Sequence, residues 1–135
     1  MNTLTIGVVE DEMIIADNLC NTLKKIGYQH TQPVSSYATA IEMLEKEKPD
    51  LVLLDIQIKG AKDGIEVAHY IREHYDIPFI FLTANSDPAT VERAKQTHPN
   101  AYLSKPFTKD DLFTAIEICM HNFSDHREQI GRAHV

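Results

Sequence analysis

One carboxylate, Asp55, stands directly after a run of four apolar residues at positions 51–54. Such a run between Pro49 and a polar loop is typical of a parallel strand buried on both faces, because a half-exposed strand would alternate with polar residues. Ligands of open α/β sheets bind outside the carboxyl ends of the strands, which is where this fold would place Asp55. An aspartate is ionised at neutral pH and needs no general base to act as a nucleophile. We therefore interpret Asp55 as a nucleophile that accepts a phosphoryl group.

Four further polar residues, Glu10, Asp11, Thr83 and Lys105, directly follow other apolar runs. In a sheet of flavodoxin-like order 2-1-3-4-5 they would meet Asp55 at one edge, with three carboxylates in the crevice between the first and third strands. Crowded carboxylates destabilise a fold unless a cation offsets their charge. Mg²⁺ is the expected cation, since it prefers oxygen ligands and needs only one or two carboxylates.

This combination of residues suits phosphoryl transfer, which requires in-line positioning and compensation of charge on the phosphoryl oxygens. Mg²⁺ and the Lys105 ammonium would supply positive charge, and the Thr83 hydroxyl a hydrogen bond. A histidine-based metal site is not favoured, because His69 and His74 are five residues apart and do not share a helical face.

The elements that position these residues can be read from the apolar pattern. Five short apolar runs are typical of strands, at 4–9, 30–34, 51–55, 79–83 and 101–104. Helical spacing and capping signals predict five helices, at 12–26, from 37 to before Pro49, and at 64–75, 88–96 and 109–123. Strands that alternate with helices predict a doubly wound parallel sheet of the α/β class.

Length and composition limit the classes of protein that fit. We expect one domain over residues 1–123, because 135 residues are too few for two ordinary domains. Residues 124–135 are polar and are interpreted as a C-terminal tail, the start of a linker, or residues added by cloning. Cys20 and Cys119 fall on apolar helix faces and are expected to be buried free thiols.

Charge and hydropathy indicate where the protein works. A net charge of -7 argues against a domain that binds nucleic acid through a basic face. No apolar run has the length of a membrane span, and the first residues lack the basic and apolar regions of a signal peptide. We expect a cytoplasmic protein with no membrane partner.

Several short motifs together resemble the receiver domain of bacterial two-component response regulators. The resemblance runs from about Thr3 to Phe123 and is carried by Glu10-Asp11, Asp55, Asp63-Gly64, Thr83-Ala84, Tyr102 and Lys105-Pro106. Each motif is weak by itself, but all occur in the expected order at strand ends. Three features depart from the common pattern: Lys59 replaces a frequent proline, Glu10 replaces a more frequent Asp, and the loop to Asp63 is about one residue longer.

The resemblance implies a role for each residue. Asp55 would take phosphate from a sensor histidine kinase or a histidine phosphotransfer protein. Gln57 and Asn85 would lie beside the phosphoryl group and influence its lifetime. Asp11, Asp55 and the backbone carbonyl of Gln57 would hold Mg²⁺, with Glu10 helping directly or through water. Thr83 and Lys105 would contact the phosphoryl group, Tyr102 would turn inward as Thr83 moves, and the Lys105-Pro106 bond would be cis. The chain would be a phosphoprotein switch and not an enzyme, apart from its own phosphorylation and dephosphorylation.

Two alternatives remain open from the residues. One is a Mg²⁺-dependent phosphatase or phosphomutase with an aspartyl nucleophile, although Gln57 stands where such enzymes usually carry a second acid. The other is a receiver-like interaction module that is never phosphorylated.

Two apolar patches suggest protein partners. Met13 and Ile14 either form an exposed docking surface for the kinase or widen the core face of the first helix. The last helix carries three apolar residues outside the stripe that faces the core: Phe113, Ile118 and Met120. Together with the preceding strand they are expected to form a homodimer surface.

Overall fold

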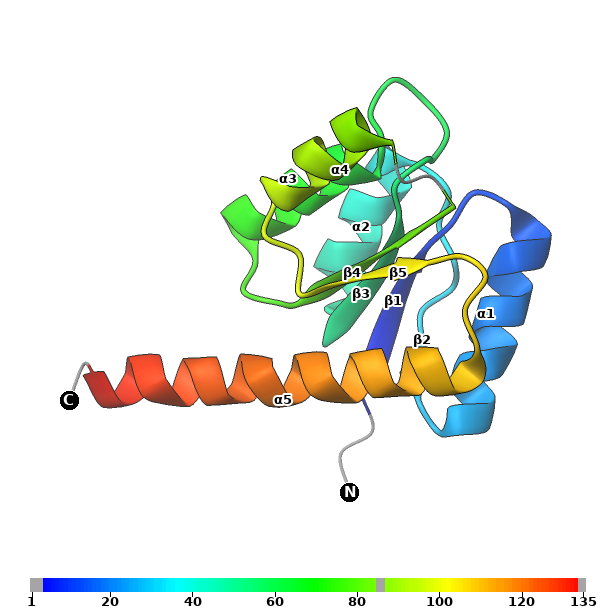
Figure 1. Cartoon of the computed structure of the whole chain (residues 1–135). Coiled ribbons are helices and arrows are strands. Elements are labelled where there is room, and N and C mark those ends of the chain that lie inside the picture. The colour runs from blue at the N-terminus through cyan, green and yellow to red at the C-terminus, as the bar shows by residue number, and fades with distance from the viewer. Residues whose placement is uncertain (1–3, 85–86, 134–135) are drawn as a thin grey trace.

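The computed structural model describes residues 4–84 and 87–133, with side chains up to residue 124. Strands and helices alternate along the chain (Figure 1). The elements are β1 (Thr5–Val9), α1 (Met13–Ile26), β2 (Gln29–His30), α2 (Tyr37–Glu47), β3 (Leu51–Asp55), α3 (Gly64–His74), β4 (Phe79–Thr83), α4 (Pro88–Lys95), β5 (Ala101–Ser104) and α5 (Lys109–Ala133). The five strands are parallel and lie in the order β2-β1-β3-β4-β5, as the sequence predicted.

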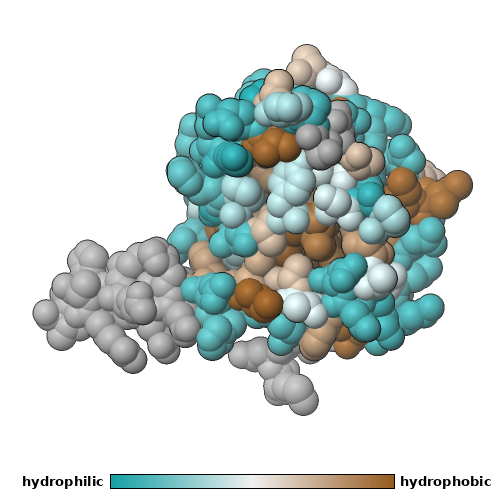
Figure 2. All heavy atoms as spheres, viewed as in Figure 1, coloured by the Kyte–Doolittle hydropathy of each residue, from teal (hydrophilic) through white to brown (hydrophobic). Residues whose placement is uncertain are grey.

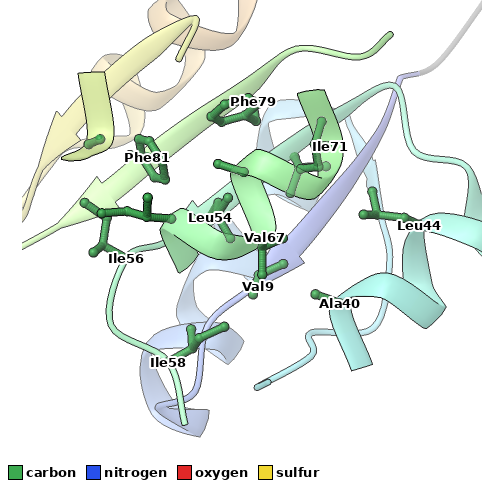
Figure 3. Close-up of a cluster of buried hydrophobic side chains, with 14 of the residues drawn as sticks. Val9, Ala40, Leu44, Leu54, Ile56, Ile58, Val67, Ile71, Phe79 and Phe81 are labelled. Atoms are coloured by element: carbon green, nitrogen blue, oxygen red, sulfur yellow. The ribbon is translucent and has the colours of Figure 1, made fainter. Parts of the chain in front are cut away.

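Helices cover both faces of the sheet and bury its central strands. On one face, α2 and α3 pack over a core that includes Val9, Leu54 and Phe81, and Figure 3 shows these side chains meeting those of α3. On the other face, α1 and α5 pack over a second core that includes Val8 and Leu53. Every residue of β3 and β4 is buried, which explains why their sequences are almost continuously apolar.

The predicted helix boundaries are largely confirmed by capping groups. Ser36 and Thr39 form a capping box at the start of α2, and Thr108 and Asp111 exchange side-chain to backbone bonds of 3.0 Å before α5. Gly27 ends α1 in the left-handed conformation, with φ of 116°. The sequence therefore contains the local signals that start and stop most helices.

The second strand is shorter than the predicted 30–34. After β2 the chain keeps a single bridge between Val9 and Val34, and the Val8 amide donates to the Thr31 hydroxyl at 3.2 Å instead of to a strand carbonyl. Pro33 has no amide to continue the ladder. The apolar pattern alone did not reveal this interruption.

The last helix is longer than predicted. It was expected to end at Phe123 but continues to Ala133, and Figure 1 shows its final turns running past the sheet. Positions 124–130 contain neither Gly nor Pro, so nothing in their local sequence stops the helix, although they lack an apolar stripe. Among the helices described, none has the length and hydropathy to cross a membrane.

Candidate functional site

The register of the sheet brings the ends of four strands to one edge. Val9 pairs with Leu54, and Asp55 pairs with Leu82, so β1, β3 and β4 end side by side. Thr83 pairs with Ser104 at the end of β5. The polar residues that follow these strands are therefore neighbours in space although up to 95 positions separate them in the chain.

Lys105 links two buried carboxylates at this edge. Its Nζ atom donates to Glu10 Oε1 at 2.8 Å and to Asp55 Oδ2 at 3.0 Å. Glu10 and Asp55 are only 3% and 7% exposed. Burial lowers the pKa of Lys105, but its hydrogen bonds to Glu10 and Asp55 and their negative charges outweigh that effect and raise its pKa above the ordinary value. The lysine is thus held as a cation between the two acids.

Backbone amides bind the remaining oxygens of both carboxylates. The Glu12 amide donates to Glu10 Oε2 at 3.1 Å, and the Gln57 amide donates to Asp55 Oδ1 at 3.1 Å. Each acid is therefore bound by one backbone N–H and by Lys105, which fixes the orientation of its carboxylate.

Asp11 completes a cluster of three acids. Oxygen atoms of Glu10, Asp11 and Asp55 all lie within 4.8 Å of one another. Three convergent carboxylates provide the oxygen donors that a hard cation such as Mg²⁺ prefers, so the residues present fit this metal. A cavity of about 280 Å³ opens beside them, and its lining includes Asp11, Asp55, Gln57, Thr83 and Lys105.

The other predicted site residues lie on β4 and β5 or directly after β5. Thr83 is 2% exposed at the end of β4, and its backbone carbonyl accepts from the Lys105 amide at 2.8 Å. Tyr102 is half-buried on β5, with its ring centroid 6.3 Å from that of Phe81. The Lys105-Pro106 bond is cis, as expected. Asn85 lies outside the described residues.

Glycine is required at position 64 for a reason that the sequence did not reveal. Gly64 was predicted to open a helix, which it does, but it also lies against the backbone of Asp55. A Cβ atom at Gly64 would be 2.0 Å from the Asp55 carbonyl oxygen and 2.9 Å from the Ile56 Cα. Only glycine allows this approach. The Asp63-Gly64 pair was the signal, but a sequence does not give the distance to Asp55.

The loop between β3 and α3 is fixed at both ends by contacts that the sequence did not predict. Lys59 pairs with Ser36 in an isolated bridge, and the Lys62 ammonium lies 4.5 Å from the Tyr37 ring centroid. Asp63 caps α3 and accepts from Arg93 of α4 at 3.0 Å. This loop carries Gln57, so its attachments also hold that part of the cavity.

Two apolar side chains project from the start of α1. Met13 and Ile14 are 77% and 78% exposed. Figure 2 shows apolar atoms that project beside polar surface on the right-hand side, where α1 begins in Figure 1. The interpretation that they widen the core is therefore wrong. Cys20 and Cys119 are free and buried, as predicted.

The apolar residues of α5 do not form one surface. Phe113 and Ile118 are exposed, but Met120 is half-buried against the core. Phe113 shares a face with Glu117, whose carboxylate accepts from Tyr28 at 2.5 Å on the α1 side. Ile118 is five residues beyond Phe113, about 140° around the helix, and so lies on the opposite flank.

Comparisons with known proteins agree with this geometry. The family model for the response regulator receiver domain matches residues 6–117. The transcriptional regulatory protein PdtaR of Mycobacterium tuberculosis (strain CDC 1551 / Oshkosh) is 36% identical over 118 residues, which cover 87% of this chain and 57% of that protein. The chain therefore spans little more than half the length of this relative.

Solved structures of similar fold include two receiver domains. The signal receiver domain of a modulated diguanylate cyclase from Desulfovibrio desulfuricans G20 has a TM-score of 0.88 and 31% identity, covering 93% of this chain and 99% of that one. The BeF3-activated N-terminal receiver domain of Klebsiella pneumoniae RstA has a TM-score of 0.79 and 25% identity, covering 86% and 97%.

Proposed function

Since this chain belongs to the response regulator receiver domain family, we propose that it is a signalling switch in which Asp55 accepts a phosphoryl group. The observation that carries this proposal is the arrangement of Asp55, which is buried, bonded to Lys105 and open to a cavity lined by Thr83 and Gln57. A nucleophilic carboxylate with a cation and a hydroxyl beside it has what phosphoryl transfer requires.

In the transfer, an Asp55 oxygen forms a P–O bond while the P–N bond to the donor imidazole breaks, and the imidazole leaves with the electron pair. The Gln57 amide, 3.1 Å from Oδ1, keeps the carboxylate oriented during attack. Lys105 Nζ, 3.0 Å from Oδ2, is within reach of a phosphoryl oxygen on Asp55. Later hydrolysis removes the phosphoryl group: water attacks phosphorus, and the P–O bond to Asp55 breaks.

Asp11, Asp55 and the backbone carbonyl of Gln57 would hold Mg²⁺, with Glu10 contributing directly or through water. When bound, the ion supplies positive charge that offsets the charge on the phosphoryl oxygens. The three carboxylates within 4.8 Å of one another support this assignment.

The switch itself is assigned to Thr83 and Tyr102. A phosphoryl group adds charge and acceptor oxygens that Thr83 and Lys105 can bind in one state only, which shifts a two-state equilibrium. Tyr102 is half-buried and is adjacent to Phe81 across the ladder, so it can turn inward when Thr83 moves. The change would reach the surface formed by α4, β5 and α5.

The partners follow from this role. A sensor histidine kinase or a histidine phosphotransfer protein would donate the phosphoryl group in the cytoplasm, without direct nucleic acid or membrane contact by this domain. Residues 1–123 would form the receiver, and α5 beyond them would lead to whatever the domain controls. Catalysis would be limited to phosphorylation and dephosphorylation of Asp55.

Intact-mass measurement with acetyl phosphate and Mg²⁺ tests the proposal. We expect a single phosphoryl adduct of wild type that is lost in Asp55→Asn and retained in Asp50→Asn, a matched change at an exposed aspartate directly before the start of the same strand. An unphosphorylated interaction module would give no adduct. A phosphatase or phosphomutase would release phosphate from small phosphomonoesters with many turnovers, which we do not expect because Gln57 replaces the second acid.

A further inference from the structure

The loop between β3 and α3 changes from buried to exposed a few residues after β3. Ile56 and Ile58 are 2% and 8% exposed and belong to the core that α2 and α3 cover (Figure 3). Residues 59–62 are all exposed, and Gly60 has a left-handed φ of 101°. The core therefore holds the first residues of this loop, but residues 59–62 must be held by other contacts.

The start of α2 supplies two such contacts. Ser36, the N-cap of α2, pairs with Lys59 in an isolated parallel bridge. The Lys62 ammonium lies 4.5 Å from the centroid of the Tyr37 ring, a distance typical of a cation–π contact. The exposed part of the loop is thus attached to α2 at both of its ends.

Tyr37 is itself held firmly enough to act as an anchor. Its ring packs against the core and meets the Tyr70 ring of α3 edge to face, with the two centroids 6.3 Å apart. Its backbone opens α2 directly after the capping box of Ser36 and Thr39. A ring that is already ordered loses little conformational entropy when Lys62 binds it.

The segment before Tyr37 is bound to the end of β1. The Val34 amide donates to the Val8 carbonyl at 3.0 Å, and the Glu10 amide donates to the Val34 carbonyl at 2.9 Å. The start of α2 therefore has a fixed position relative to the strand end that carries Glu10. Attachment of the loop to α2 fixes the loop relative to the same strand end.

Gln57 is the loop residue through which these attachments reach Asp55. Its amide donates to Asp55 Oδ1 at 3.1 Å, and it precedes the bridge at Lys59 by two residues. An outward movement of residues 59–62 would tilt the Gln57 backbone and weaken this bond. The orientation of the Asp55 carboxylate therefore depends on where the exposed part of the loop is held.

We propose that Tyr37 and Lys62 form a clamp that holds this loop against α2, and that Tyr37 is a positioning residue for the phosphorylation of Asp55. The clamp acts through the Gln57 backbone, whose amide orients the Asp55 carboxylate and whose carbonyl would hold Mg²⁺. The same part of the chain departs from the common receiver pattern, in the length of the loop and at Lys59. This inference rests on the proposed phosphorylation of Asp55.

Hydrogen exchange of the Gln57 amide in the unphosphorylated full chain measures the clamp directly. We expect Lys62→Met to speed this exchange about threefold, the size expected for the loss of one exposed cation–π contact. Lys62→Arg keeps a cation over the ring and should exchange like wild type. Lys46→Met removes the same charge from a lysine of α2 that is 71% exposed, and it should also exchange like wild type.

Phosphorylation by acetyl phosphate and Mg²⁺ measures the consequence for Asp55. We expect initial rates about threefold lower in Lys62→Met and Tyr37→Leu, but close to wild type in Tyr37→Phe, whose ring still binds the ammonium. Combining Tyr37→Leu with Lys62→Met should lower the rate no further, since both changes remove one contact. Tyr75→Leu removes another half-buried tyrosine from the same core, at the opposite end of α3 from the loop, and should leave the rate unchanged.

A different role for Lys62, attraction of the anionic donor by its charge alone, predicts other results. Lys62→Met would then lower the rate only at low salt, Tyr37→Leu would leave it unchanged, and exchange of the Gln57 amide would match wild type. Any of these three results would overturn the clamp.

The two measurements also separate the clamp from the proposed function. If every variant forms the adduct at the wild-type rate and exchange is unchanged, the clamp is wrong and phosphorylation of Asp55 stands. If wild type forms no adduct, the proposed phosphorylation is wrong and with it the positioning role of Tyr37.

Discussion

At the scale of single residues, the position of the Asp55 carboxylate depends on the backbone contact that Gly64 makes with Asp55. The Gly64 amide donates to the Ile56 carbonyl at 2.7 Å, and its Cα faces the Asp55 carbonyl. The start of α3 and the end of β3 are therefore in direct backbone contact. Any side chain at Gly64 must separate them.

We predict that Gly64→Ala destabilises the fold by about 3 kcal/mol, because its Cβ would overlap rigid backbone instead of a side chain that can move. Chemical denaturation measures this loss. Phosphorylation of Asp55 by acetyl phosphate should also be slower in the folded fraction, since the acceptor must shift.

Gly7→Ala is the matched control. Its Cβ would lie 3.1 Å from both the Met43 Cε and the Pro49 Cγ, and the methionine end can move. We expect a loss of about 1 kcal/mol or less and normal phosphorylation. Equal losses for the two alanines would show that the contact with Asp55 has no special cost.

Sequence reasoning predicted which residues meet at this edge of the sheet but not the contacts among them. Strand ends predict that Asp55, Thr83 and Lys105 meet at one edge, because parallel strands all end there. The pairing of Lys105 with Glu10 depends on side-chain directions set by tertiary packing, which the apolar pattern does not encode. The same limit applies to Gly64, whose nearest contact is nine positions away in the chain.

At the scale of elements, the apolar pattern predicted every helix and strand that the structure describes, but not every end. Boundaries set by local caps, such as Ser36 and Gly27, were predictable. The early end of β2 was not, because it depends on the Thr31 hydroxyl accepting from Val8 in a neighbouring strand. The extension of α5 was missed because an exposed polar helix has no periodic apolar stripe.

Arg72 connects α3 with the segment between α4 and β5. Its guanidinium donates to the carbonyls of Thr97, Ile77 and His98 and to the Asn100 side chain. It also lies 4.4 Å from the Phe79 ring centroid. Burial lowers the pKa of Arg72 and the charge of Asp76 opposes this, so the group is a desolvated cation that depends on its acceptors.

We predict that Arg72→Met destabilises the protein by about 2–3 kcal/mol, because it removes the guanidinium that donates to the partly buried carbonyls of Thr97 and Ile77 and to two exposed acceptors. Urea denaturation measures the change. Hydrogen exchange should also become faster in the segment 97–100, whose backbone Arg72 holds.

Arg93→Gln is the matched control from the neighbouring helix. Arg93 pairs with Asp63 at 3.0 Å, but the arginine side chain is 50% exposed. Exposed ion pairs contribute about 0.2–1 kcal/mol, so the loss should be small. If Arg93→Gln cost as much as Arg72→Met, burial would not be what distinguishes the two arginines.

At the scale of the whole molecule, exposed apolar side chains mark two surfaces on different sides. One is formed by Met13 and Ile14 at the start of α1, beside a hollow of about 320 Å³ lined in part by Leu19 and Phe107. The other is the flank of α5 away from α1, where the single side chain of Ile118 is exposed. A donor that phosphorylates Asp55 must reach it, whereas a second copy of the activated chain has no need to, so the two surfaces suit different partners.

We predict that Ile14→Glu slows phosphotransfer from an autophosphorylated histidine kinase by about tenfold or more, because a charge at the centre of a docking surface weakens the encounter complex. Its phosphorylation by acetyl phosphate should be unchanged, since the small donor needs no docking surface.

Ile118→Glu should affect dimerisation and not phosphotransfer. Phosphotransfer from the kinase should stay normal, but sedimentation of the beryllofluoride-activated variant should show less dimer than wild type. Each variant is the control for the other, because both place one acid at an exposed helical isoleucine. If both variants lost phosphotransfer equally, the assignment of separate surfaces to kinase and dimer would be wrong. If Ile118→Glu left a wild-type dimer intact, the dimer surface would have to lie elsewhere than the flank of α5 that carries Ile118.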